Sequence, residues 1–180
     1  MLKEFVQEKH CVFYDSASDW KDAIHKACEP IIADGTVELE YADEIVRCVE
    51  KYGPYIILIP GVAMPHSTEG GALVHKTCIS FMKLAKPVSF DDQDPEKYAD
   101  LFFTIASENA EKHLEEMQQL AALLTDDAVV EDLHKVTSEA DLEALGEKYN
   151  LLKGKRKGYL WQSGHFSSTT FSRSRSTWSA

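Results

Sequence analysis

A proline–histidine pair followed by two hydroxyl residues, Pro65-His66-Ser67-Thr68, is the group of residues in this chain best suited to chemistry. An imidazole has an ordinary pKa of about 6.5, so at neutral pH His66 offers an uncharged nucleophilic nitrogen. The hydroxyls of Ser67 and Thr68 can donate hydrogen bonds to an anion beside it. The sequence thus presents a candidate reactive histidine, although a lone Pro-His pair also fits a histidine exposed in a surface loop.

An apolar run just before this pair predicts the strand that would hold it. Tyr55–Ile59 is rich in β-branched and aromatic residues, which indicates a buried strand. Pro60 cannot donate to a strand ladder and Gly61 permits a sharp turn, so we expect the strand to end there. His66 would then lie at the rim of a sheet.

A second histidine, His113, lies near the start of a predicted helix. The stretch Ser107–Asp126 has apolar residues at the three- and four-residue spacing of a helix that packs by one face. Ser107 or Asn109 can cap this helix. Because a helix N-terminus attracts anions, His113 could help to hold a phosphoryl group there. The residues alone favour the simpler interpretation, that His113 is a polar residue of the first turns without a role.

The rest of the chain alternates between strand and helix patterns, which favours an α/β domain. Further strands are predicted at His10–Tyr14, Lys76–Leu84 and Asp100–Ala106, and further helices at about Trp20–Gly35, Leu39–Tyr52, Ala128–Lys135 and Ser138–Lys148.

The segment Gly61–Ser67 (GVAMPHS), preceded by Gly53-Pro54-Tyr55, resembles the phosphorylation-site loop of enzyme IIA of the bacterial sugar phosphotransferase system. The resemblance is to the mannitol/fructose type, and within it to the ascorbate-type members. It extends over about Leu2–Tyr149 and includes a histidine, His113, where a helix opens.

This resemblance implies a central mixed β-sheet with helices on both faces. It also implies that His66 accepts phosphate from the carrier protein HPr and passes it to a cysteine of enzyme IIB, with His113 as the second active-site histidine. Ser67, Thr68 and Gly61 are expected to position the phosphoryl group. The sugar would be ascorbate or a related acid or pentitol, and a homodimer is compatible with the family.

The cation that approaches the phosphate is left open by the sequence. Mannitol-type members carry an arginine on the helix before the active-site strand, and Glu50 stands at about that position here. Arg47 and Lys51 are the nearby candidates.

Composition limits the other functions. Of the 19 basic residues, six lie in 150–180 together with no acid, so residues 1–149 hold 13 basic and 30 acidic residues, a formal charge of −17. We therefore expect no nucleic-acid binding through a general basic surface. Residues 1–149 are predicted to form the domain. Residues 150–180, basic and rich in Ser and Thr, are predicted to be disordered or derived from an expression vector.

No apolar run approaches the ~20 residues that a membrane helix needs, and we expect a soluble cytoplasmic protein. The four cysteines lack a CxxC pair and are expected to be reduced and mostly buried: Cys11, Cys28, Cys48 and Cys78. His75 and His134 form neither an i, i+4 pair nor an HExxH motif, so we expect no metal, and no other cofactor is required.

Two alternatives stay open at this level. A regulatory protein could keep the same fold and phosphorylation but act by phosphorylation-dependent binding of another protein. A simple binding module, with His66 as a surface residue, would have no phosphoryl chemistry.

Overall fold

The computed structural model describes residues 1–149; the predicted basic tail lies outside them. The described helices are α1 (Leu2–Gln7), α2 (Trp20–Ala33), α3 (Tyr41–Tyr52), α4 (Ala110–Leu124), α5 (Asp127–Leu133), the 3-10 turn η1 (Gly71–Leu73) and a final helix over 139–149. The strands are β1 (Cys11–Tyr14), β2 (Ile57–Ile59), β3 (Gly61–Ala63), β4 (Cys78–Ser89) and β5 (Tyr98–Ala106).

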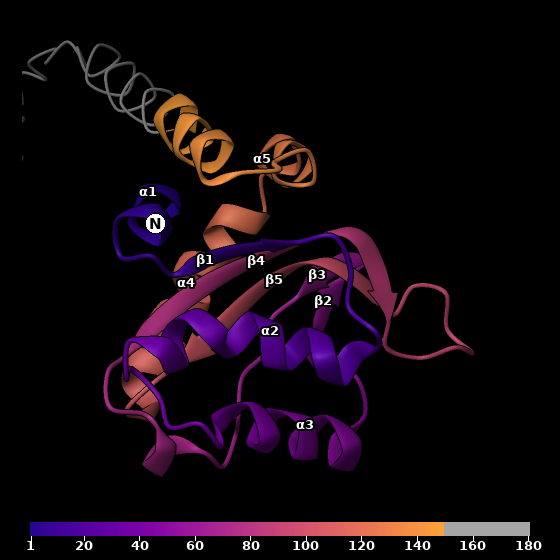
Figure 1. Ribbon diagram of the computed structural model, residues 1–180, viewed down its shortest axis with the longest axis vertical. Helices are drawn as coiled ribbons and strands as arrows, with labels where there is room; N and C mark the ends of the chain where they lie inside the picture. The colour runs from indigo at the N-terminus through magenta and orange to yellow at the C-terminus, as the bar shows by residue number, and fades with distance from the viewer. Residues whose placement is uncertain (150–180) are drawn as a thin grey trace, which may run out of the picture.

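The five strands form one mixed sheet in the order β1-β4-β5-β3-β2. β1 and β4 are parallel, as are β3 and β5, whereas β4 pairs antiparallel with β5 and β2 pairs antiparallel with β3. The long β4–β5 pair forms the centre, and its acidic connecting loop projects from the body (Figure 1). The mixed sheet implied by the family resemblance is confirmed.

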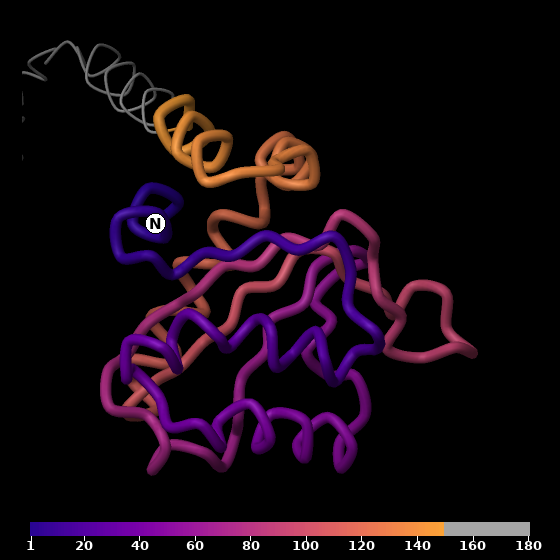
Figure 2. Tube along the Cα trace, viewed as in Figure 1, coloured from indigo at the N-terminus to yellow at the C-terminus, as the bar shows by residue number. Residues whose placement is uncertain are grey.

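Helices cover both faces of this sheet, as Figure 1 and the trace in Figure 2 show. One apolar cluster joins α2 and α3 to the sheet through residues such as Ile24, Ile45 and Phe102. The other joins α1, α4, α5 and the final helix to the opposite face around Phe81 and Phe103. Burial of apolar residues on both sides explains why the central strands are almost continuously hydrophobic.

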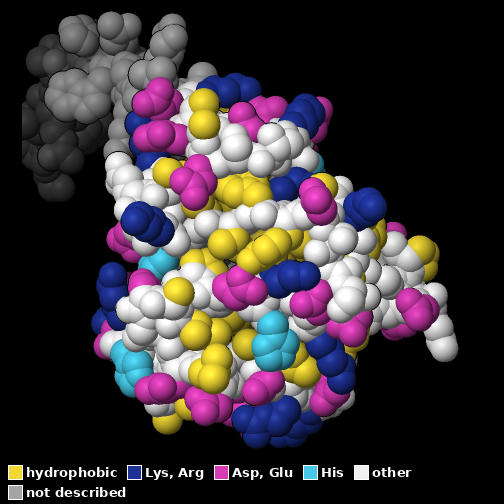
Figure 3. All heavy atoms as spheres, in the orientation of Figure 1, with side chains coloured by type: hydrophobic (Ala, Val, Ile, Leu, Met, Phe, Trp, Pro, Cys, Tyr) yellow, Lys and Arg dark blue, Asp and Glu magenta, His cyan; other side chains and the backbone are white. Residues whose placement is uncertain are grey.

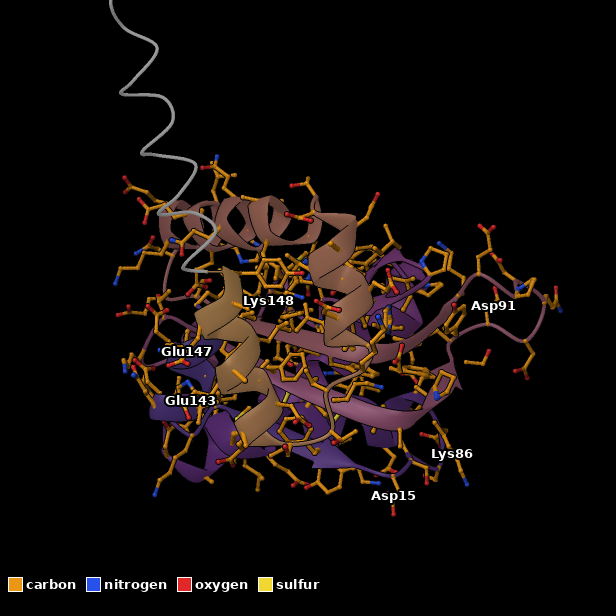
Figure 4. All side chains as sticks on the ribbon, turned by 90° about the horizontal axis from the view of Figure 1, so that it is seen from above. Asp15, Lys86, Asp91, Glu143, Glu147 and Lys148 are labelled. Carbon is orange, nitrogen blue, oxygen red and sulfur yellow. The ribbon has the colours of Figure 1, made fainter. Side chains whose placement is uncertain are left out.

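Ion pairs attach the final helix to its neighbours. Figure 4 looks down on this helix, along which the labelled Glu143, Glu147 and Lys148 lie. Glu147 meets Lys3 of α1 at 2.8 Å, and Lys148 meets Asp132 of α5 at 2.6 Å. Elsewhere, acidic and basic side chains are interspersed over the face seen in Figure 3.

The prediction of a buried strand at Tyr55–Ile59 is wrong in two respects. β2 covers only Ile57–Ile59 and lies at the sheet edge, where Leu58 and Ile59 are 42% and 41% exposed. The strand between β2 and β5 is β3, which is fully buried although it consists of Gly61, Val62 and Ala63. Hydrophobicity of a short run does not distinguish an edge strand from an inner one, since pairing partners decide that.

Several local predictions are confirmed. The helix predicted at about Trp20–Gly35 is α2, which Asp19 caps by accepting a hydrogen bond from the N–H of Asp22, at 2.9 Å. All four cysteines are free and buried. The strand predicted at Lys76–Leu84 is β4 and continues to Ser89.

None of the helices in residues 1–149 is long and apolar enough to cross a membrane.

Candidate active site

β3 carries the chain to His66 at the end of the sheet. The Pro65 carbonyl still accepts a hydrogen bond from the N–H of Ile105, at 2.9 Å, and the N–H of Met64 donates to the Ile56 carbonyl at 2.7 Å. The segment is therefore tied to β5 on one side and to the residue before β2 on the other. His66 lies where the backbone leaves this support.

The ring of His66 is buried and its tautomer is fixed. Its Nδ1 lies 2.8 Å from the Met64 carbonyl oxygen, and the side chain is only 8% exposed. A carbonyl oxygen only accepts, so Nδ1 holds the proton and Nε2 keeps the lone pair. Burial lowers the pKa of His66; the Met64 hydrogen bond opposes this shift, and the nearby His113 adds to it. His66 is thus a neutral imidazole with a nucleophilic Nε2 at neutral pH.

Tyr55 holds the backbone of the same residue. Its hydroxyl donates to the His66 carbonyl oxygen at 2.6 Å, and its ring meets the imidazole edge-on with centroids 5.1 Å apart. The sequence placed Tyr55 only as the start of a strand. Its role in supporting His66 becomes visible only when the chain folds back from β2 to β3.

His113 comes from the first turns of α4 and lies beside His66. Asn109 caps α4 by accepting from the N–H of Lys112 at 3.0 Å. The centroids of the two imidazoles are 5.3 Å apart, with ring planes inclined by 40°. Burial lowers the pKa of His113 as well. The structure therefore brings together the two histidines that the sequence singled out separately.

A hollow of about 330 Å³ opens between the loop after His66 and the start of α4. Its walls include Ser67 and Thr68 on one side and Asn109, Ala110 and His113 on the other. Free N–H groups of a helix N-terminus, two hydroxyls and an imidazole suit an anion. The hollow has the donors that a phosphoryl group requires.

Ser67 also organises the loop that forms this wall. Its Oγ accepts hydrogen bonds from the N–H groups of Glu69 and Gly70, at 3.1 and 2.7 Å. A Cβ added to Gly70 would lie 2.8 Å from this oxygen, so only glycine fits without displacement. The Sγ of buried Cys48 lies 3.8 Å from the hydroxyl oxygens of both Ser67 and Thr68.

Comparison with known proteins decides the family. The family described as phosphoenolpyruvate-dependent sugar phosphotransferase system, EIIA 2, matches residues 4–148. The chain belongs to this family. It is thus a phosphotransfer component of the sugar phosphotransferase system.

Relatives and solved structures agree with this assignment. An ascorbate-specific EIIA component of Mycoplasma pneumoniae is 38% identical over 153 residues, which cover 84% of this chain and 95% of the relative. The solution structure of the mannitol-specific cryptic enzyme IIA CmtB of Escherichia coli matches with a TM-score of 0.70 at 28% identity, over 80% of this chain and 96% of that one. A complex of enzyme IIA and phosphorylated enzyme IIB of the E. coli mannitol system matches with a TM-score of 0.66 at 29% identity, over 76% of this chain and 93% of that one.

The structure does not bring Gly61 to the EIIA site, contrary to expectation. Gly61 pairs with Ala99 at the start of β5, whereas Pro65, next to His66, bonds to Ile105 near its end. Six residues of extended β5 separate the two levels, about 20 Å along the strand. Gly61 has φ +87°, and an added Cβ would lie 2.8 Å from a ring carbon of His134. It serves the turn into β3 and a close approach of α5.

The candidate cations are engaged by carboxylates in the described EIIA structure. Arg47 forms an ion pair with Glu44, and Lys51 meets Glu69 at 2.8 Å. Glu69 follows Thr68 directly, so Lys51 is attached to the loop of the site. Glu50 faces away from this loop and pairs with Lys21 of α2.

The other histidines of residues 1–149 lie beside carboxylates, and His10 has a second one, Glu8, at 3.6 Å. His10 contacts Asp34 at 2.7 Å, His75 contacts Glu38 at 2.5 Å and His134 contacts Asp100 at 2.9 Å. Within residues 1–149 no three His, Cys, Asp or Glu side chains are grouped so as to hold a metal ion.

The sequence did not predict that Ser107 and Glu116 form a polar pair next to His113. Ser107 lies 3.4 Å from Nδ1 of His113 and donates to half-buried Glu116 at 3.0 Å. The only signal was the i, i+3 spacing of His113 and Glu116, which puts both on one helix face.

Proposed function

We propose that this EIIA protein accepts a phosphoryl group from phospho-HPr on Nε2 of His66 and passes it to a cysteine of an enzyme IIB. The observation that carries the proposal is the hydrogen bond of Nδ1 to the Met64 carbonyl at 2.8 Å, which leaves Nε2 as the nucleophile. A free Nε2 beside an anion-binding hollow is what a histidine phosphocarrier needs.

The transfer is a displacement at phosphorus. The N–P bond of the donor phosphohistidine breaks, its electron pair stays on the donor imidazole, and a new N–P bond forms to Nε2 of His66. Little else must change covalently, so positioning and charge stabilisation dominate the catalysis. The lowered pKa of His66 supports this role, since the ring is uncharged and nucleophilic at neutral pH.

Donors for the three phosphoryl oxygens are available around the hollow. His113 can donate from its ring, and the first N–H groups of α4 are free of intrahelical partners. Ser67 accepts two backbone hydrogen bonds, so its one hydroxyl proton remains to be donated. Fixed donors of this kind stabilise the charge of the transferring group without reorganisation.

The names of the relatives support the proposed sugar and partners. The M. pneumoniae relative is named ascorbate-specific, which supports ascorbate, or a related acid or pentitol, as the transported compound. The mannitol-system complex with phosphorylated IIB supports an enzyme IIB as the acceptor. Ascorbate and IIB specificity are thus proposed together, whereas a homodimer stays a prediction.

The test is transfer of labelled phosphate from phosphoenolpyruvate through enzyme I and HPr to this protein. We expect an acid-labile, base-stable phosphate on the wild type that is lost in His66→Ala and kept in the control His25→Ala, which changes an exposed histidine of α2. His113→Ala should still accept phosphate but transfer it slowly. Wild-type protein that stays unlabelled beside active HPr would refute the proposal.

A second step separates the carrier from the regulatory alternative. Labelled protein is mixed with the cytoplasmic domain of an ascorbate-type enzyme IIB. Transfer of the label to the IIB cysteine supports the carrier role. Stable labelling without transfer to any IIB would favour a protein that acts by phosphorylation-dependent binding.

A further inference from the structure

Three polar side chains form a continuous path that leads away from the hollow. Nδ1 of His113 lies 3.4 Å from Oγ of Ser107, and this hydroxyl lies 3.0 Å from Oε2 of Glu116. Ser107 belongs to the loop between β5 and α4, while His113 and Glu116 occupy one face of α4. The path therefore connects the second active-site histidine to a carboxyl group outside the site.

Glu116 lies at the wall of a different hollow, of about 190 Å³, on the side of α1. The titratable groups around it are the amino group of Met1, Glu4, Glu8, His10, Lys76, Cys78, Lys112 and His113. Burial raises the pKa of Glu116 to about 7, and the Ser107 hydrogen bond and Lys112 offset this only in part. Its carboxyl group can therefore be protonated or ionised near neutral pH.

The single hydroxyl proton of Ser107 makes the path directional. If Glu116 is protonated, it donates to Oγ of Ser107, Ser107 donates to Nδ1 of His113, and the imidazole proton must lie on Nε2. If Glu116 is ionised and His113 neutral, Ser107 donates to the carboxylate and accepts from Nδ1–H, which leaves Nε2 without a proton. The protonation state of Glu116 thus selects the tautomer of His113.

We propose that Glu116 is a positioning residue that acts through Ser107 to keep Nε2 of His113 protonated, so that His113 donates a hydrogen bond to the phosphoryl group on His66. This inference rests on the phosphocarrier role proposed above. Glu116 itself touches neither the phosphoryl group nor His66. It acts only through the hydroxyl of Ser107.

Arrival of the dianionic phosphoryl group moves one proton along this path. The O–H bond of the Glu116 carboxyl breaks and a new O–H bond forms on Ser107, whose original proton bonds to Nδ1 of His113. The carboxyl becomes a carboxylate and the imidazole becomes an imidazolium, so no proton enters from outside. The charged donor gives a stronger hydrogen bond to the phosphoryl oxygens than the neutral one.

The first test measures the tautomer of His113 in the unphosphorylated protein by ¹⁵N–¹H correlation spectra of the imidazoles between about pH 6 and 8.5. In the wild type we expect His113 to change from the Nε2–H to the Nδ1–H form as Glu116 ionises. Glu116→Gln should abolish this change because an amide does not titrate. Glu115→Gln, the matched control on the exposed side of α4, should behave like the wild type.

The second test measures transfer of phosphate from labelled His66 to enzyme IIB at pH 7. Glu116→Gln can still keep Nε2 of His113 protonated through its amide N–H but cannot supply the proton that makes the ring an imidazolium. Its transfer should therefore be about tenfold slower than that of the wild type and of Glu115→Gln, as expected when a charged hydrogen-bond donor is replaced by a neutral one. Ser107→Ala should show the same loss, Ser107→Thr should restore the rate, and the double variant Ser107→Ala, Glu116→Gln should be no slower than either single one.

The outcomes separate this inference from the function on which it rests. A wild type that phospho-HPr does not label overturns both, whatever the imidazole spectra show. A labelled wild type in which Glu116→Gln leaves the tautomer change and the transfer rate as they are in Glu115→Gln overturns this inference alone.

Discussion

The chemistry of single residues in this EIIA protein depends on which imidazole nitrogens are free. Nδ1 of His66 donates a hydrogen bond to the Met64 carbonyl oxygen, and Nδ1 of His113 lies within hydrogen-bond distance of the Ser107 hydroxyl. In both rings this leaves Nε2 for the phosphoryl chemistry that we propose, as nucleophile in one and as donor in the other. In this proposal, two identical side chains receive different roles from their hydrogen-bond partners.

Tyr55→Phe tests how strictly His66 must be held. It removes a 2.6 Å hydrogen bond and leaves the His66 carbonyl without this partner, which we expect to cost about 1–2 kcal/mol of unfolding free energy. Phosphate transfer should slow as well, because the imidazole loses part of its support. Urea unfolding and labelling rates measure the two effects. Tyr52→Phe is the control, since its hydroxyl bonds Glu69 at the exposed surface; equal effects of both changes would contradict the prediction.

Burial of neutral His66 predicts how stability depends on pH. Its folded pKa is below the ordinary value of about 6.5, so in mildly acidic solution the unfolded chain binds a proton that the folded chain does not. The contribution of His66 is fully present above the unfolded pKa and is lost as the pH falls from that value toward the folded pKa. Urea unfolding at several pH values should show a steeper acid loss in the wild type than in His66→Gln. A similar change in exposed His25→Gln would argue against His66 as the cause.

At the scale of elements, β3 and α4 form the site together. β3 is short, but its pairing with β5 continues as far as Pro65 and so fixes the point at which His66 leaves the sheet. α4 begins after its N-cap, Asn109, on the far side of the hollow. It carries His113 in its first turns. The loop from Ser67 to Gly70 closes the hollow between them.

Gly61→Ala is expected to weaken the fold rather than the chemistry. The φ of +87° and the 2.8 Å approach to His134 should together destabilise the protein by about 1–3 kcal/mol. Gly35→Ala is the matched control, because its φ of +76° is similar but nothing lies within 4 Å of an added Cβ. Urea midpoints should fall more for Gly61→Ala, while phosphate still enters His66 well below the melting temperature. Loss of labelling in Gly61→Ala with an unchanged urea midpoint would show that Gly61 has a role in the phosphorylation site after all.

At the scale of the whole molecule, a sheet covered on both faces leaves its edges and strand ends for function. The site occupies the end of the sheet where β3 and β5 finish. Its hollow lies between the start of α4, which belongs to one layer, and Tyr41 of α3, which belongs to the other. Tyr41 and Val74 of the apolar cluster under α2 and α3 thus form part of the wall of this hollow.

Removal of residues 150–180 tests the predicted domain boundary. Both hollows lie within residues 1–149, and the family match ends at residue 148. We therefore expect a chain that ends at Tyr149 to accept phosphate from phospho-HPr at the rate of the full chain. A large loss of labelling, with the urea midpoint unchanged, would show that the basic segment takes part in partner binding.

Much of this protein is determined by local sequence. Strand and helix patterns, the Asn109 cap and the turn at Pro60-Gly61 each depend on residues close together in the chain, so they are visible without the fold. The loop Gly61–Ser67 indicated the family, and His66 and His113 were identified at their places beside a strand and a helix.

Other features are decided only by the tertiary structure. Strand pairing decides that β2 lies at the edge of the sheet and β3 inside it, and that Gly61 is far from the site. Helix packing decides the 5.3 Å distance between the two imidazoles and the burial of Glu116. These contacts join segments tens of residues apart, and their energies depend on which surfaces are buried together. The sequence by itself determined the reactive groups, and the packing of α4 against β5 brought the two imidazoles together at the end of the sheet.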